Sequence, residues 1–441
     1  MPRATSFTAW FVVLSLGLGC ATEPDLARPE ASGAFTVIDG YATYVPGDTL
    51  TLTLSGTDDQ GLEWLGYNLL RGQVAIRDSF PVRGRSVTRT VAVRVPATWI
   101  GNSELSAFAR DASGNVDGTT LDSIHVVNAI RRPMTSLSLP ALVRDVVADS
   151  EHNLLYLSLP PAQQVAILDL TAGVLRPPIQ LFGSPWGLDL TPGNDSLVVA
   201  LRRTHALAFV NLATGVVDTI GLVMPTDFAQ GPGTLRVMGN GKVVHAITFD
   251  GTGYEADGFR VFDLATKTDR SRRDAFIGGA SSDVVPLVRN SDRSRLVAVI
   301  AGNCCPAAGN VYAAPADTFG RQRPTVDRFY PAVSGDALGS RFLIDDVVFD
   351  STLTEVVRLG PQTVDSLRNW ATVISPDGRF AYIARDQAYK KIRIDGVSEI
   401  ERVLIPVTPY LMIVPPRGDA LIAFTGSAAG SDSRVWILDL R

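Results

Sequence analysis

Ile167-Leu168-Asp169-Leu170-Thr171-Ala172-Gly173 is an apolar strand that ends at an aspartate and runs directly into a turn. The same pattern returns further along the chain, at residues 209–215, 261–266, 348–350, 392–396 and 437–440, with a degraded copy at 311–314. About 270 residues separate Asp169 from Asp439 and hold six intervals, so the period is about 45 residues, the length of a four-stranded propeller blade. Seven copies predict an all-β fold in which residues 133–441 form a seven-bladed β-propeller.

The Asp or Asn of each copy has a mechanical role. Its short side chain can accept a hydrogen bond from the backbone two residues further on, which closes the turn after the third strand. Gly173 and Gly215 can adopt the positive φ that such a turn needs. We therefore interpret these carboxylates as structural residues and not as catalytic acids.

A second turn, inside each inner hairpin, carries a family resemblance. It occurs at residues 191–195, 375–378 and 415–419. Ser375-Pro376-Asp377-Gly378-Arg379-Phe380-Ala381-Tyr382-Ile383-Ala384 closely resembles the YVTN-type β-propeller repeat. The resemblance covers most of residues 133–441 and implies the fold but no activity, because propellers of this family include surface-layer proteins, binding proteins and a few enzymes.

The two ends of the repeat array predict how the ring closes. The last repeat stops after its third strand at residues 439–441, so it lacks an outer strand. Residues 135–139, just before the first repeat, can supply that strand. Such closure joins the first and last blades and leaves no open sheet edge across the ring.

Residues 34–128 show the alternation of a half-buried β-sheet. Every second side chain is apolar in residues 49–54 and 90–95. Further candidate strands lie at residues 35–39, 62–69, 73–78, 104–111 and 122–127. Seven strands in about a hundred residues predict an immunoglobulin-like β-sandwich.

Two stretches of this segment resemble the immunoglobulin-like domains of bacterial surface proteins. They are residues 46–48 and residues 109–116, the latter matching the D-x-x-G-N turn that precedes the final strand of those domains. There is no cysteine pair, so Trp64 is expected to pack the core. The aspartates of this segment could bind calcium or could close Asx turns, as loop aspartates usually do: Asp58, Asp59, Asp111 and Asp117.

The first residues predict export. Arg3 precedes an apolar run at residues 10–19 and then Cys20, which is the pattern of a signal peptide over residues 1–19. Residues 16–20 resemble a bacterial lipobox, although Gly17 stands where a larger apolar residue is usual. The resemblance implies lipidation of Cys20 and an outer-membrane destination, and the alternative is plain secretion. Residues 20–33, rich in Pro, Glu and Ala, are expected to be a flexible tether.

Composition excludes other classes of protein. The net charge is -5 and no basic block occurs, so the electrostatic footprint of a nucleic-acid-binding protein is absent. No other apolar run approaches the ~20 residues of a membrane-spanning helix, so membrane contact is expected only through the lipid anchor. The adjacent Cys304 and Cys305 fit neither a zinc site nor a disulfide framework, and both a vicinal disulfide and two free thiols remain open.

The repeat register places candidate ligand-binding residues on one face of the propeller. Loops that enter first strands and loops that join second to third strands share this face, around the channel mouth. The residues expected at or beside the mouth are Arg144, Trp186, Asp227, Asp283, Trp370 and Tyr410, and those in the surrounding loops are Arg202, Arg203, His205, Asp250, Glu255, Cys304, Cys305, Asp386 and Tyr389. Exposed aromatics beside Arg and Asp favour a recognition surface, although Trp and Tyr could instead cap the tunnel.

Signatures of catalysis are weak. The chain has four histidines, and the register places His152 on the face opposite to His205, which disfavours a shared metal cluster. Gly-x-Ser-x-Gly and nucleotide-binding fingerprints are missing. The sequence therefore predicts a non-catalytic, envelope-anchored binding module with a protein or carbohydrate ligand and no cofactor. The alternative is a metal-assisted lactonase-like or lyase-like enzyme in which Asp227 and Asp283 imitate metal ligands.

Overall fold

In the computed structural model nearly all the described secondary-structure elements are β-strands, and the chain divides into two compact units, Met1–Val126 and Val127–Arg441. The remaining described elements are four 3-10 turns, η1 (Ala97–Trp99), η2 (Pro160–Ala162), η3 (Arg202–Thr204) and η4 (Ala314–Ala316). The described residues are 27–36, 42–71, 74–223, 230–249, 259–272, 285–300, 307–320, 322–326, 332–360, 371–385, 387–426 and 432–441.

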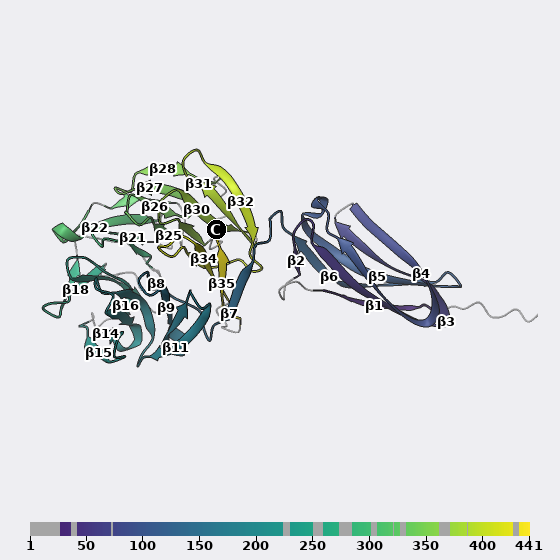
Figure 1. The fold of residues 1–441 in the computed structure, drawn as a ribbon, viewed down its shortest axis with the longest axis horizontal. Coiled ribbons are helices and arrows are strands. Elements are labelled where there is room, and N and C mark those ends of the chain that lie inside the picture. Colours follow the sequence, from purple (N-terminus) through teal and green to yellow (C-terminus); the bar gives the residue numbers. More distant parts are fainter. Residues whose placement is uncertain are drawn as a thin grey trace, which may run out of the picture. The chain divides into compact units, whose positions relative to one another are not determined.

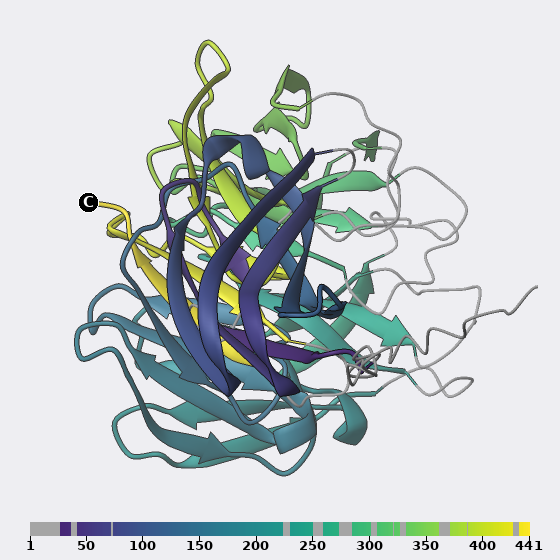
Figure 2. The same cartoon turned by 90° about the vertical axis from the view of Figure 1, so that its right-hand side faces the viewer.

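One continuous sheet forms the N-terminal unit. Its strands are β1 (Glu30–Phe35), β2 (Thr43–Tyr44), β3 (Thr49–Arg71), β4 (Val74–Arg94), β5 (Gly101–Asp111) and β6 (Val116–Val126). The first part of β3 pairs with β1 and with the end of β4, whereas its second part pairs with β5 and with the start of β4. Figure 2 shows how the long strands curve. Register shifts between Thr57 and Trp64 let β3 bend and continue, so segments expected as separate short strands are joined.

Trp64 was expected to pack the core, and the bulge in β3 makes this expectation wrong. Past it, Leu65, Tyr67 and Leu69 face the core, and Trp64 is left half-buried. Trp99, carried by η1, fills the core in its place and is 4% exposed. The first strand also begins at Glu30, inside the segment that was expected to be a tether.

The D-x-x-G-N turn forms as a closed loop of hydrogen bonds. The backbone N–H of Asn115 donates to Oδ1 of Asp111 at 2.8 Å, and its side-chain amide donates to Oδ2 at 2.7 Å. Asp58 likewise accepts from the backbone N–H groups of Gln60 and Gly61 at 2.9 and 2.6 Å. Both carboxylates are thus used by their own turns.

In the C-terminal unit the described strands form seven consecutive antiparallel sheets. The first two contain β8 (Val146–Asp149), β9 (Leu154–Leu159), β10 (Gln164–Asp169) and β11 (Val174–Gln180), then β12 (Pro185–Leu190), β13 (Ser196–Leu201), β14 (Ala206–Asn211) and β15 (Val217–Gly221). The next two contain β16 (Gln230–Val237), β17 (Lys242–Phe249), β18 (Phe259–Asp263) and β19 (Thr268–Arg272), then β20 (Leu287–Arg289), β21 (Arg295–Ile300), β22 (Ala308–Ala313), β23 (Thr318–Phe319) and β24 (Arg323–Pro324).

The last three sheets repeat the plan, with one change. The fifth and sixth contain β25 (Val333–Gly335), β26 (Arg341–Ile344), β27 (Val347–Asp350) and β28 (Glu355–Arg358), then β29 (Thr372–Ile374), β30 (Phe380–Arg385), β31 (Ala388–Arg393) and β32 (Ser398–Leu404). The seventh contains β33 (Leu411–Ile413), β34 (Ala420–Thr425), β35 (Arg434–Asp439) and β7 (Met134–Ser138). The first strands of successive sheets contact one another, and Figure 1 shows the sheets arranged around a common centre.

Strand β7 confirms the predicted source of the last outer strand. It pairs antiparallel with β35, with Leu137 opposite Val435 and Met134 opposite Leu438. The backbone N–H of Leu139 then donates to the carbonyl of Ser433 at 2.8 Å. The seventh sheet therefore contains both the beginning and the end of the C-terminal unit.

The turns after the third strands also form as predicted. In five of them the side-chain Oδ1 of the Asp or Asn accepts a hydrogen bond from the backbone N–H two residues further on, at 2.8 to 3.1 Å; the acceptors are Asp169, Asn211, Asp263, Asp350 and Asp439. Gly173 and Gly215 have φ values of 66° and 71°. Turn geometry therefore explains these five residues, whereas Asp395 in the copy at 392–396 accepts instead from the guanidinium of Arg341 at 2.9 Å.

Acid should weaken these turns. A hydrogen bond from the Lys242 ammonium, together with backbone N–H groups of Thr266 and Ala265, lowers the pKa of Asp263 from 3.8 to about 2. Because the folded pKa is depressed, this stabilisation is present above 3.8 and is lost as the pH falls towards about 2. We expect Asp263→Asn, which keeps a turn-forming amide as at Asn211, to flatten the fall of the melting temperature between pH 4 and pH 2. An unchanged slope would contradict this assignment.

Candidate functional site

Paired charges occupy the innermost strands of the first four sheets. Asp145, just before β8, accepts from Nη1 and Nη2 of Arg236 on β16 at 2.7 and 2.9 Å. The backbone N–H groups of Leu188 and Val146 donate to the same carboxylate at 3.0 and 2.9 Å. Both oxygens are thus satisfied, and the pair links the first sheet to the third.

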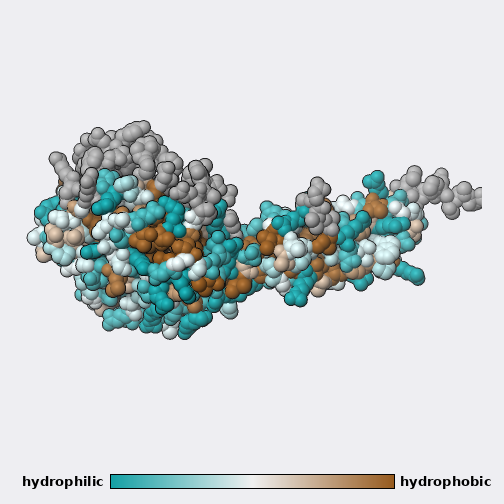
Figure 3. Space-filling view, turned by 90° about the horizontal axis from the view of Figure 1, so that it is seen from above, coloured by the Kyte–Doolittle hydropathy of each residue, from teal (hydrophilic) through white to brown (hydrophobic). Residues whose placement is uncertain are grey.

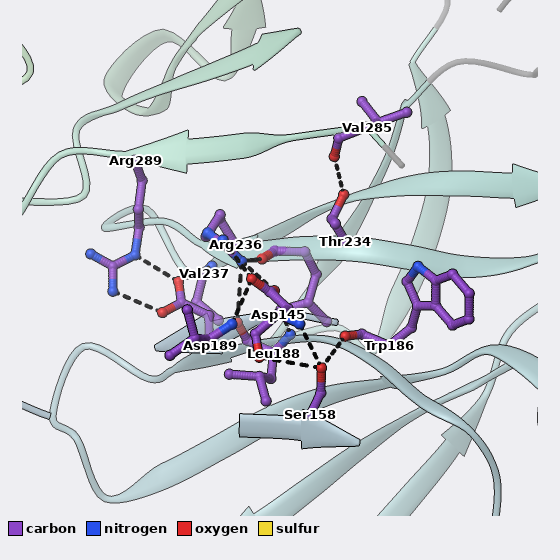
Figure 4. Close-up of polar contacts among 12 residues, drawn as sticks. Asp145, Ser158, Trp186, Leu188, Asp189, Thr234, Arg236, Val237, Val285 and Arg289 are labelled. Carbon is purple, nitrogen blue, oxygen red and sulfur yellow. Dashed lines mark hydrogen bonds and ion pairs between the residues drawn. The ribbon is translucent and has the colours of Figure 1, made fainter. Parts of the chain in front are cut away.

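A second pair repeats this geometry one sheet further on. Asp189 on β12 is fully buried and accepts from Nε and Nη2 of Arg289 on β20 at 2.6 and 2.8 Å. The backbone N–H of Val237 donates to Oδ2 at 2.8 Å. Burial disfavours ionisation of Asp189, but the charges of Arg289, Arg236 and Arg293 outweigh it and hold its pKa below the usual value. Figure 4 shows both pairs side by side.

These pairs border a central cavity of about 280 Å³. The two Asp–Arg pairs and Asp336 lie in its wall, and apolar residues including Val333, Val373, Met412 and Ile413 line it elsewhere. Within the residues that the structure describes, no three His, Cys, Asp or Glu side chains gather as a metal site would require. Asp145 and Asp189 are engaged by arginines and by backbone N–H groups, and Asp336, which also lines the cavity, accepts from the backbone N–H and the hydroxyl of Ser340.

Sequence reasoning missed these pairs. Asp145, Asp189, Arg236 and Arg289 each stand beside or within a short apolar strand, and a charge in an innermost strand is the signal that could have identified them. Asp145 and Arg236 are 91 residues apart in the sequence, and Asp189 and Arg289 are 100 residues apart, so only the arrangement of the sheets brings each pair together.

Three of the predicted mouth residues, Arg144, Trp186 and Tyr410, lie at or just before the starts of first strands and differ in role. Tyr410, just before β33, donates its hydroxyl to the carbonyl of Val143 at 3.1 Å and accepts from its N–H at 2.9 Å. Burial raises the pKa of Tyr410 to about 12. This tyrosine fastens the seventh sheet to the first, which is the capping role considered above. Arg144 lies just before β8 and contacts Trp186.

Trp186 lies between cations. The guanidinium carbons of Arg144 and Arg202 are 4.3 and 4.2 Å from the centroid of its indole ring. Each contact is a cation–π interaction, which holds both arginines close to the same ring. Figure 4 shows the indole pointing away from the Asp–Arg pairs.

A pocket of about 400 Å³ lies beside this tryptophan. We call it the Arg-Trp pocket, and its lining residues are Pro160, Pro161, Gln163, Ser184, Trp186, Arg202 and Arg203. The hairpins after β9 and β13 supply its walls, each through a 3-10 turn that ends in a left-handed residue, Gln163 with φ 52° and His205 with φ 50°. Trp186 and Arg202 were predicted to share one face, and the fold brings them into one pocket.

The remaining predicted site residues divide into three groups. His205 is exposed and lies at the end of η3, outside the pocket lining. Tyr389 was expected in a loop, but β31 begins at Ala388 and buries Tyr389 completely, beside Tyr382. The others lie outside the described residues, namely Cys20, Asp227, Asp250, Glu255, Asp283, Cys304, Cys305, Trp370 and Asp386.

Comparison with known proteins supports the fold alone. No protein-family model and no curated protein matches the chain. Among solved structures, hydrazine synthase of Kuenenia stuttgartiensis is similar at a TM-score of 0.50 and 13% identity, covering 66% of this chain and 94% of that one. The β-propeller domain of Cps50 (Swd1) from Myceliophteria thermophila is similar at a TM-score of 0.52 and 10% identity, covering 70% and 100%.

These likenesses and the repeated four-stranded sheets identify a β-propeller fold. The described residues contain no helix with the length and apolar character that crossing a bilayer requires.

Proposed function

We propose that this chain is an envelope-anchored, non-catalytic binding module that presents a protein or carbohydrate ligand site on a propeller. The seven sheets would be the seven blades of a closed, YVTN-type ring, which the pairing of β7 with β35 supports. The N-terminal unit would be an immunoglobulin-like sandwich. Its divided first strand supports that proposal, because β1 pairs with β3 while β2 pairs in parallel with β6.

The Arg-Trp pocket is the observation that carries the proposal. Concave sites of about 300 to 1,000 Å³ are typical of ligand binding, and Trp and Arg dominate binding energies at interfaces. Phe182, two residues before the lining residue Ser184, is 96% exposed. An exposed aromatic side chain this close along the chain to the pocket supports contact with a partner. Figure 3 shows apolar side chains gathered on one face of the C-terminal unit amid hydrophilic ones.

Ligand capture should depend on this pocket. We expect Trp186→Ala combined with Arg203→Ala to remove capture of envelope components in a pull-down, since truncating a hot-spot residue costs about 2 kcal/mol or more. The matched control is Lys391→Ala with Arg417→Ala, because these residues line a pocket of about 270 Å³ formed by turns between first and second strands, at the opposite strand ends.

Two results would contradict the proposal. One is loss of capture in the control variant alone, with melting temperatures unchanged. The other is tightly bound, stoichiometric calcium or magnesium in the purified protein together with turnover of a lactone, which would favour the metal-assisted enzyme.

Lipid anchoring is tested separately at Cys20. Expressed in a Gram-negative host, the chain should fractionate with membranes, and Cys20→Ser should release it into the soluble periplasmic fraction, because acylation requires the thiol. Immunoblots of the two fractions measure this. Equal partitioning of both forms would remove the lipoprotein proposal.

A further inference from the structure

We propose that strand β4 of the N-terminal unit is a membrane-facing edge whose arginines bind the phosphates of anionic lipid headgroups. This contact complements the lipid anchor proposed at Cys20, and in that respect it rests on the proposed function. It lies in a different unit from the Arg-Trp pocket, so the two sites can be tested separately.

Positive charge in the N-terminal unit is concentrated on β4. This strand holds five arginines and a single carboxylate, namely Arg77, Arg83, Arg85, Arg89, Arg94 and Asp78. The other strands of the unit together hold two arginines and eight carboxylates. Because the whole chain has a net charge of -5, β4 is a positive stripe on an acidic molecule.

The β4 arginines have no carboxylate partner. All five are exposed, and none of them forms an ion pair with another described residue. The two arginines of the other strands are engaged, since Arg110 lies 3.8 Å from Glu63 and Arg71 donates to the carbonyl of Thr98 at 2.6 Å. The guanidinium donors of β4 are therefore available to an external anion.

Aromatic rings hold two of these arginines in place. The guanidinium carbon of Arg77 is 4.2 Å from the ring centroid of Phe108, and that of Arg89 is 4.4 Å from the ring centroid of Phe80. Stacking uses the flat face of a guanidinium and leaves its in-plane N–H groups free for bidentate binding of a phosphate. Because the side chains are already restricted, less freedom is lost on binding.

The outer edge of β4 is open but unsuited to an added strand. Among the described strands β4 pairs only with β3. Pro81 has no N–H to offer, and the register shift next to Gly84 interrupts the ladder. Both features disfavour strand addition by a peptide or by a second copy of the chain.

The arginines project from both faces of the sheet. Phe80, which Arg89 contacts, packs against the core, whereas Phe108, which Arg77 contacts, lies outside that core cluster. A partner bound to one face of the sheet would meet only some of these side chains. A flat anionic surface facing the edge meets arginines from both faces, and a bilayer is such a surface.

The proposed anchor keeps this edge within reach of a bilayer. Ten residues separate Cys20 from Glu30, where β1 begins, and they span at most ~36 Å. Because β1 and β4 pair with opposite edges of the first part of β3, they are about 10 Å apart. One membrane signal alone gives marginal, reversible binding, and a basic patch is a suitable second signal. Release of Cys20→Ser into the soluble fraction is therefore still expected at physiological salt.

Vesicle sedimentation of the Cys20→Ser chain tests the contact without the lipid. At low salt the chain should bind vesicles that contain phosphatidylglycerol and should not bind vesicles of phosphatidylcholine alone. Raising the salt to about 1 M should abolish binding, because the Debye length falls to about 3 Å. No binding to the anionic vesicles would overturn the proposal and leave the arginines as protection of an open edge.

Two further probes separate a bilayer from other sources of negative charge. Inorganic phosphate, added at the concentration of the lipid phosphate, should not displace the chain, since a free anion cannot contact several arginines at once. Displacement would overturn the bilayer assignment. Retention on heparin, a soluble polyanion, without binding to vesicles would overturn it as well.

Charge variants locate the contact on β4. Combining Arg83→Gln, Arg85→Gln and Arg94→Gln should weaken vesicle binding about a hundredfold, since each basic residue near an anionic surface contributes about fivefold, or about 1 kcal/mol. Replacing the same three residues with lysine keeps the charge and should keep most of the binding. Melting temperatures show whether each variant is folded. Equal losses in the folded lysine and glutamine variants would contradict a role for charge.

The matched control removes the same charge elsewhere. It combines substitutions of three exposed arginines of the C-terminal unit, Arg323→Gln, Arg393→Gln and Arg417→Gln. This variant should bind vesicles like the parent chain, because β4 is intact although the net charge has changed equally. A loss as large as that of the β4 glutamine variant would refute the assignment to β4.

The anchor and the β4 edge fail differently. If Cys20 is not acylated, the unmodified chain and Cys20→Ser fractionate alike, but anionic vesicles still bind Cys20→Ser. If β4 does not face the bilayer, Cys20→Ser binds no anionic vesicles, whereas fractionation of the unmodified chain with membranes still depends on Cys20.

Discussion

Replacing Asp189 with asparagine is expected to lower the free energy of unfolding of the C-terminal unit by about 3 to 5 kcal/mol. Breaking one partner of a buried ion pair has a cost of this size because the other charge stays buried and uncompensated. Asp189 is fully buried, receives a bidentate contact from Arg289 and accepts the backbone N–H of Val237. Arg293, whose pKa burial lowers to about 10, lies 3.9 Å from the same carboxylate.

Chemical denaturation followed by circular dichroism measures this loss. Glu355→Gln is the control, because Glu355 pairs with Arg358 at an exposed site, and such pairs contribute about 0 to 1 kcal/mol. A second variant, Asp189→Leu with Arg289→Met, should be more stable than Asp189→Asn, since it removes both charges. Equal stability of Asp189→Asn and Glu355→Gln would mean that the buried pair does not hold the sheets together.

The second large effect is expected from two truncations that differ by thirteen residues. A chain that begins at Val127 keeps β7, whereas a chain that begins at Pro140 lacks it. We expect the first to fold with native stability in the C-terminal unit. The second should lose several kcal/mol, because each lost backbone hydrogen bond contributes about 0.5 to 1.5 kcal/mol and the apolar contacts of Leu137 and Leu139 are removed as well.

The shorter chain should also associate. Without β7, β35 presents a row of unpaired N–H and C=O groups, which is a template for pairing with another chain. Light scattering after size-exclusion chromatography should therefore show oligomers only for the chain that begins at Pro140. If both truncations are monomeric and melt at the same temperature, β7 does not close the ring.

Much of the propeller unit could be predicted from the sequence because its signals are local. A turn after each third strand needs a short oxygen-bearing side chain, so Asp169, Asn211 and Asp263 report the repeat directly. The pairing of β7 with β35 followed from counting strands. The shared face of Trp186 and Arg202 followed from the register, since equivalent positions of a repeat lie at equivalent places in the fold.

Other features depend on contacts that no local pattern records. The bulge in β3 reverses the alternation at one point, and this leaves Trp64 half-buried and gives its core position to Trp99. The Asp–Arg pairs join residues about a hundred positions apart, and the period of 45 residues does not specify them. The volume of the Arg-Trp pocket depends on how two neighbouring hairpins pack, which sequence periodicity leaves open.

Each Asp–Arg pair joins two sheets that are not neighbours in the chain order. Asp145 of the first sheet pairs with Arg236 of the third, and Asp189 of the second sheet pairs with Arg289 of the fourth. Repeat proteins usually gain and lose units easily during evolution, because each unit depends only on its immediate neighbours. Here, inserting or deleting a sheet among the first four would separate Asp145 from Arg236 or Asp189 from Arg289 and leave a buried charge without its partner. The fifth to seventh sheets place Val333, Val373 and Ile413 at the cavity instead, so tolerated changes in repeat number should be confined to that side of the ring.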